Sequence, residues 1–178
     1  MSKIVDFFTE EGTDHRERTH AGLIAMTDAG FEGCHDHIQW LFPLHEKSYH
    51  SKEEVPVLTT EDVKQLFNSR EASLVMQRGY ARFMKFLGLN STSDEDNRKR
   101  AQWCTDSNHN LLRITRAIRS LRFFGCVSNA ILLHSRATTA AGARKIDPNT
   151  FAYWDDALNK PMWESMTARF LKDREIRV

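Results

Sequence analysis

Glycine and proline are scarce in this chain, and their scarcity limits the folds that the chain can adopt. The 178 residues include eight glycines and four prolines, about 7% of the chain against a usual combined share of roughly 12%. Sandwiches and barrels of many strands need a turn every few residues, and those turns rely on these two residue types. No strand-like alternation of apolar and polar residues runs beyond four residues. We therefore predict an all-α protein.

The apolar content is sufficient for a real core. Hydrophobic residues make up 40% of the chain, and the aromatic residues include 11 Phe and 4 Trp, which argues against intrinsic disorder. The length is typical of one domain, and neither a fixed-period repeat nor a domain boundary is visible. We predict a single compact globular domain over residues 1–178, built from about seven to nine short helices.

In the N-terminal part, apolar residues recur at helical spacing. Residues 4–8 form one apolar stripe. Thr19 is expected to cap a second helix, which Gly30 would end in a left-handed conformation. A third helix is expected over residues 31–41, because Pro43 excludes the helical conformation from the residue before it.

Helix starts and stops are also readable in the rest of the chain. Residues 59–62, Thr-Thr-Glu-Asp, predict a capped helix start. Gly88 and Gly125 are expected to close two long amphipathic helices. Residues 90–97 read as an exposed polar connector. The remaining expected helix starts are Ser107 or Asn108, Ser128, Asp147 before Pro148, and Pro161.

Several broad classes can be set aside. The three cysteines are an odd number without a CxxC pair, so we expect neither a disulfide framework nor a zinc site built on them. Residues 1–25 contain five acids and no apolar segment of the secretory type. No apolar run approaches the roughly 20 residues of a membrane span. We expect a cytoplasmic protein without a membrane span.

The net charge of +1 conceals an uneven layout. Residues 98–145 contain ten basic residues and a single acid, Asp106, so the rest of the chain is net acidic. In one interpretation the two parts face each other and neutralise within the fold. In the other, some of the basic side chains face outward and attract an anionic ligand or a nucleic acid.

A first candidate segment contains Cys34, His35, His37, His45 and His50. Five potential metal ligands lie within 17 residues, but the first two histidines would point about 200° apart on a helix and cannot share an ion. We predict no metal site. On a helix His35 would instead hydrogen-bond Gln39, four residues later.

A second candidate segment begins at Asn108. His109 would lie at a helix start, with Arg113 and Arg116 one and two turns later, so the three could hold an anion. Alternatively, the arginines would pair with acids such as Glu61 or Asp62. Neither interpretation provides a nucleophile, and the catalytic motifs G-x-S-x-G, G-x-x-x-x-G-K-[ST] and H-E-x-x-H are absent. We predict no cofactor.

These segments carry a resemblance to a known family. Residues 35–44, HDHIQWLFPL, resemble the block H-[DNS]-Y-I-Q-W-L-F-P-L of the opioid growth factor receptor family, with His37 in the tyrosine place. Residues 108–121 resemble its N-H-N-H-L-R-[IL]-T-R-I-L-[RK]-S-L block. Residues 56–59, PVLT, resemble its P-x-L-T helix start. The chain is similar to the conserved N-terminal domain of that family, in its compact form.

The resemblance implies an all-α fold and a receptor-like role, because animal members of the family are receptors for an opioid pentapeptide that restrain growth. We accordingly predict a non-enzymatic helical binding domain for a small molecule or peptide. One alternative is an enzyme or binder that acts on a phosphorylated or nucleotide-like molecule at a His/Arg site. Another is a nucleic-acid-associated module that uses residues 98–145.

The two family blocks are predicted to pack together, because polar side chains inside apolar helices need partners. His35 and Gln39 would face His109 and Arg113. A sealed cluster would be a structural network, whereas an open one would be an anion pocket. Trp40 is expected either in the core or at a ligand. The candidate ligand-binding residues are His35, Gln39, Trp40, His109, Asn110, Arg113 and Arg116.

Overall fold

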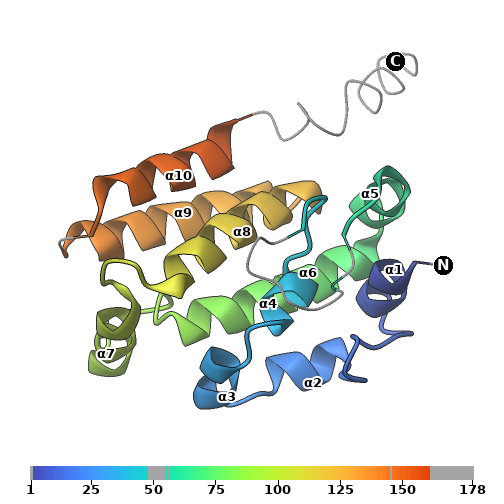
Figure 1. Ribbon diagram of the computed structural model, residues 1–178, viewed down its shortest axis with the longest axis horizontal. Coiled ribbons are helices and arrows are strands. Elements are labelled where there is room, and N and C mark those ends of the chain that lie inside the picture. The colour runs from blue at the N-terminus through green and yellow to red at the C-terminus, as the bar shows by residue number, and fades with distance from the viewer. Residues whose placement is uncertain (1, 48–54, 56, 145, 161–178) are drawn as a thin grey trace.

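The computed structural model describes residues 2–47, 55, 57–144 and 146–160 (Figure 1). This part of the chain contains ten α-helices and no strand, which confirms the all-α prediction with more helices than expected. The helix predicted from Pro161 lies outside the described residues. In chain order the helices are α1 (Lys3–Phe8), α2 (His20–Ile24), α3 (Asp28–Gly33), α4 (His37–Leu41), α5 (Thr60–Phe67), α6 (Arg70–Phe86), α7 (Asp94–Trp103), α8 (His109–Phe123), α9 (Val127–Gly142) and α10 (Pro148–Asn159).

Four of the predicted helix starts are confirmed, those of α2, α5, α8 and α10. The side chain of Thr19 caps α2, and Asn108 and Asp147 cap α8 and α10. At α5 the Thr59 hydroxyl accepts from the backbone N–H of Asp62, whose carboxylate accepts from the N–H of Thr59. Such reciprocal capping satisfies two backbone donors that the helix itself leaves unpaired.

The region after Thr19 is divided differently from the prediction. Helix α2 ends at Ile24, and Gly30 lies inside α3, because the Thr27 hydroxyl accepts from its N–H and caps a new helix. The single helix expected over residues 31–41 is two helices, α3 and α4. The carbonyl of Cys34 accepts from the side chains of His37 and Arg113 instead of continuing a helical ladder.

Two further boundaries differ. Helix α7 begins at Asp94, inside the stretch predicted as a connector, because the Ser93 hydroxyl accepts from the N–H of Asp96 and carboxylates occupy the first turn. Ser128 lies within α9, whose N-cap is Cys126. Gly88 and Gly125 follow α6 and α8 with φ of 65° and 69°, the left-handed closure that glycine allows.

The helices form two parts around one core. Helices α8, α9 and α10 contact one another in one layer, and α6 contacts α9 from below (Figure 1). Helices α1, α2 and α5 pack on α6. The largest fully buried side chains come from both parts and are mostly aromatic: Trp40, Trp154, Phe7, Phe8, Phe31, Phe42 and Phe83. None of the described helices is long and apolar enough to cross a membrane.

Candidate functional site

The two segments that resemble family blocks meet where the start of α8 faces the connection between α3 and α4. Arg113 Nη2 lies 3.4 Å from His35 Nδ1. The rings of His35 and His109 are nearly perpendicular, with centroids 5.8 Å apart. The predicted contact between the two segments is therefore present.

Glu32, which the sequence analysis does not single out, lies at the centre of this cluster. Its carboxylate pairs with His109 Nε2 at 2.9 Å and Arg113 Nη1 at 3.3 Å. It also accepts from Asn110 Nδ2 at 3.2 Å. The acid expected to pair with these arginines was Glu61 or Asp62, but Asp62 instead caps α5. In the sequence, the one indication that Glu32 joins this cluster is its position three residues before His35.

The cluster has the geometry of a structural network. The Arg113 side chain is only 6% exposed, and it also donates to Asn110 Oδ1 and to the carbonyls of Glu32 and Cys34. Burial lowers the pKa of Arg113 even though the Glu32 carboxylate opposes the shift. Since Glu32 already occupies the position that an anion would take, these contacts favour the network over the anion pocket.

The other predicted site residues lie apart from this cluster. Trp40 is 2% exposed and donates from Nε1 to His15 Nδ1 at 3.0 Å, so it is part of the core. Gln39 is also buried on α4. Arg116 Nε donates to the Phe42 carbonyl at 2.9 Å. A ligand-binding role for these residues stays a prediction.

Asp36 organises a second network on the other side of the α3–α4 connection. Its carboxylate lies 3.0 Å from His15 Nε2, 2.8 Å from Arg16 Nε and 3.0 Å from Arg18 Nη2. Burial alone would raise its pKa, but the hydrogen bond from Cys34 and the charge of Arg18 hold it at about 2. The described residues contain no group of side chains that could hold a metal ion.

The four arginines of α8 all have partners in the fold, and two of these partners are acids. Arg113 and Arg119 pair with Glu32 and Glu46 from the acidic part of the chain. Arg122 donates to the carbonyls of Ala157 and Lys160 at 2.8 and 3.0 Å. The interpretation in which the two parts of the chain face each other therefore accounts for Arg113 and Arg119, whereas Arg116 and Arg122 bond to backbone carbonyls.

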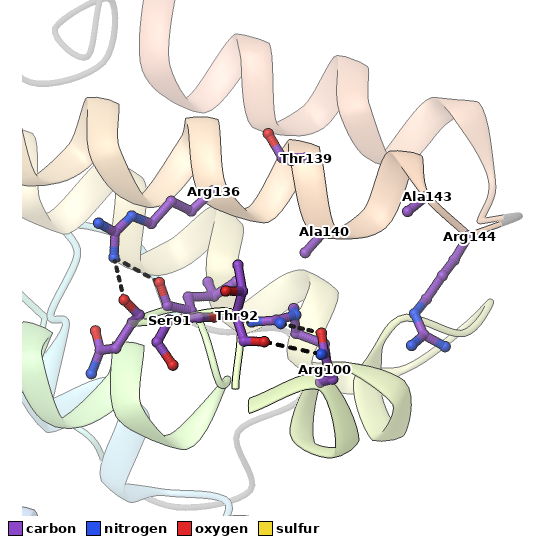
Figure 2. A pocket seen from close by; sticks show the side chains of 11 residues that line it. Ser91, Thr92, Arg100, Arg136, Thr139, Ala140, Ala143 and Arg144 are labelled. Atoms are coloured by element: carbon purple, nitrogen blue, oxygen red, sulfur yellow. Dashed lines mark hydrogen bonds between the residues drawn. The ribbon is translucent and has the colours of Figure 1, made fainter. Parts of the chain in front are cut away.

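Three other arginines of the basic segment line a cavity of about 460 Å³ between α7, α9 and the α6–α7 connection (Figure 2). Arg100 comes from α7, Arg136 from α9, and Arg144 follows the end of α9. These arginines belong to the basic segment 98–145, and their gathering at one cavity is not predicted from the sequence. A usable signal was the spacing of Arg136, Ala140 and Arg144, which places all three on one face of a helix.

Together these features define an all-α fold with an arginine-lined cavity and a polar network around the buried Arg113 side chain, in which Glu32 and His109 are 43% and 44% exposed. Residues 27–135 match the family model described as the opioid growth factor receptor (OGFr) conserved region. Because this match covers more than half of the chain, the protein belongs to that family. The matched residues include the Glu32 network and end directly before Arg136, so most of the α9 side of the cavity lies beyond them.

Curated relatives agree with this assignment. Opioid growth factor receptor-like protein 1 of Mus musculus is 34% identical over 103 residues, which are 53% of this chain and 21% of the relative. The opioid growth factor receptor of Homo sapiens is 33% identical over 104 residues, 53% of this chain and 15% of the receptor. The chain thus matches about a fifth or less of each relative's length. No solved structure matches the chain.

Proposed function

We propose that this protein is a non-enzymatic binding domain that takes an anionic ligand in the arginine-lined cavity. The observation that carries the proposal is the composition of the lining. Its residues, all within the described part of the chain, include Arg100, Arg136 and Arg144 and no carboxylate. Guanidinium groups at a water-accessible cavity attract carboxylates and phosphates and can bind them with two parallel hydrogen bonds.

The contrast with those arginines that pair with acids supports this choice of site, although Arg116 and Arg122 of α8 also donate to backbone carbonyls. Arg18, Arg82 and Arg113 each lie within 3.3 Å of a carboxylate oxygen. Around the cavity, Arg136 and Arg100 instead donate to backbone carbonyls, at 2.7 Å to Leu89 and 2.7 Å to Ser91. These carbonyls orient the guanidinium groups but carry no countercharge, and Arg100 also interacts electrostatically with the Asp96 carboxylate, which lies outside the cavity lining.

Arg144 has the greatest freedom to meet a ligand. Its side chain is exposed, and within the described residues it makes no side-chain hydrogen bond or ion pair. Its full set of donors is thus available to an incoming anion. The family relatives are named as receptors, and a receptor-like binding role, in the cytoplasm, is part of this proposal for a small molecule or peptide.

The test is titration of the full chain with inorganic phosphate and with citrate, followed by calorimetry and by thermal unfolding. A ligand that binds only the folded state raises the melting temperature. Arg144→Gln should weaken binding by about tenfold, the usual loss for one charge-assisted hydrogen bond. The matched control is Arg98→Gln, which removes the same charge from an exposed α7 residue outside the cavity.

Two results would contradict the proposal. Equal weakening in both variants would mean that the anion responds to overall charge and not to the cavity. Binding of a single-stranded oligonucleotide that falls steeply with salt, and that Arg98→Gln weakens as much as Arg144→Gln, would favour a nucleic-acid surface instead.

A further inference from the structure

The cationic groups of the cavity are held apart from one another. Arg136 lies on α9, whereas Arg144 lies beyond the last residue of that helix, Gly142. Figure 2 shows their side chains at opposite ends of the cavity, with Arg100 between them. Thr139, Ala140 and Ala143 follow one another along α9 (Figure 2). A compact anion at one end would therefore leave the charge at the other end unpaired.

The hydrogen bonds of the lining keep this separation. Arg136 Nη1 donates to the carbonyls of Leu89 and Asn90, at 2.7 and 3.5 Å. Arg100 is held by the carbonyls of Gly88 and Ser91 and by the side chain of Asn97. Neither guanidinium can move to the opposite end of the cavity without giving up those bonds. Arg144, whose side chain is exposed, lies at the end of the cavity nearest the C-terminus of α9.

On the α9 wall, the part of the cavity between the terminal arginines is uncharged and made of small side chains. Between the terminal arginines, α9 contributes Thr139, Ala140 and Ala143 to the lining. Small residues let a ligand approach the helix closely, and the Thr139 hydroxyl, which donates to the Ser135 carbonyl at 2.9 Å, can still accept a hydrogen bond. A volume of about 460 Å³ falls in the range of small-molecule sites and is far larger than a single inorganic anion requires.

We propose, building on the anion-binding function above, that the ligand is an elongated small molecule with an anionic group at each end. One end group binds at Arg136 and the other at Arg144, and a short uncharged middle lies along Thr139 and Ala140 of α9, with Arg100 of α7 between the two ends (Figure 2). The end groups are carboxylates or phosphates, since both accept from guanidinium in the same way.

The experiment uses dicarboxylates as a molecular ruler. Suberate, which has a chain long enough to reach both ends, is compared with succinate, which is too short. Each diacid is compared with the monoacid of equal carbon number, octanoate or butyrate, so that the contribution of the apolar chain cancels. We expect suberate to bind about tenfold more tightly than octanoate, because it gains a second charge-assisted contact, and succinate to show no such advantage over butyrate.

Variants then locate the two ends. Arg144→Gln and Arg136→Gln should each remove the advantage of suberate over octanoate, whereas Arg98→Gln should retain it. Arg144→Gln is the safer of the two, because within the described residues this side chain supports no other group. Hexanediol bisphosphate serves as the phosphate counterpart of suberate. Tighter binding of the bisphosphate than of suberate, with the same response to the variants, would identify phosphate as the end group.

The possible failures are distinguishable. If octanoate and suberate bind equally, and Arg144→Gln weakens both, the cavity takes a single anionic group. That result would overturn the two-ended ligand and leave the anion-binding function standing. If none of these acids or phosphates binds, both proposals are wrong. An advantage of suberate that persists in Arg136→Gln and in Arg144→Gln would place the second contact elsewhere and would also overturn the two-ended site.

Discussion

His20 should make the stability of this protein depend on pH. Its side chain is 1% exposed, and neither ring nitrogen has a hydrogen-bond partner in the described part of the chain. The centroid of its ring lies 5.6 Å from that of Phe7 and 6.2 Å from that of Phe8. Burial, and secondarily the charge of Arg78, lowers the pKa of His20 to about 4, although Glu10 opposes this shift.

The sign of the effect follows from the two protonation states. In the unfolded chain a histidine takes up a proton near pH 6.5, whereas folded His20 does so only near pH 4. Between these two pH values the unfolded chain binds a proton that folded His20 does not bind. The free energy of unfolding is therefore highest above pH 6.5 and decreases as the pH falls toward 4. The slope approaches about 1.4 kcal/mol per pH unit, and the whole loss is on the order of 3 kcal/mol.

The test is His20→Leu, which replaces the ring with an apolar side chain of comparable size. Urea unfolding of both proteins between pH 7.5 and about 5 gives the difference in free energy of unfolding at each pH. The difference should shift in favour of the variant by about 2 kcal/mol on going from pH 6.5 to 5. At neutral pH the variant should be at least as stable as the parent, since two unpartnered nitrogens leave the core.

Buried His37 titrates in the same direction, because burial and then the charge of Arg113 lower its pKa to about 3. Its contribution remains in the variant, so the pH dependence should be reduced and not abolished. Asp36, with a pKa near 2, titrates below the chosen range. Parallel stability curves for the parent and His20→Leu would refute the reasoning, because they would show that folded His20 takes up a proton as readily as the unfolded chain does.

Three further substitutions test the packing. Glu32→Gln should lower the free energy of unfolding in urea by about 1–3 kcal/mol, because it leaves a buried guanidinium without its carboxylate. The control Glu11→Gln, at an exposed site, should change it by less than about 0.5 kcal/mol. Equal effects of the two substitutions would contradict the network. Trp40→Ala should cost about 3–5 kcal/mol, and a variant of parental stability would remove this side chain from the core. Gly88→Ala should lower the melting temperature, since its Cβ would lie 2.5 Å from a backbone oxygen at a φ of 65°, whereas Gly142→Ala, with nothing within 4 Å, should be neutral or stabilising.

The parts of the fold that could be predicted from sequence are those that local chemistry determines. Thr59, Asn108 and Asp147 cap their helices with groups that lie within three residues of the cap. The break between α3 and α4 could not be predicted in this way. It depends on Arg113, whose side chain reaches the Cys34 carbonyl from 79 positions away in the sequence, and no local pattern records such a contact.

The same distinction applies to the candidate site. Because buried polar groups need partners, the contact between His35 and Arg113 could be predicted. This requirement alone does not identify Glu32 as the partner, because the choice among the acids of the chain depends on the tertiary fold. The arginine cavity was missed for a similar reason. Its lining combines α9 with the residues around Ser91, and their proximity appears only once α6, α7 and α9 are packed.

The contacts of α8 have a consequence for the order in which the chain folds. Arg113 meets Glu32 across 81 residues, Arg116 meets Phe42 across 74, and Ser120 meets Pro43 across 77. Helices α8, α9 and α10, in contrast, follow one another directly and pack together. Closing long loops costs entropy before the contacts form, and it slows folding. The C-terminal layer should therefore assemble early and the N-terminal helices dock onto α8 late, so that Glu32→Gln should act mainly by accelerating unfolding.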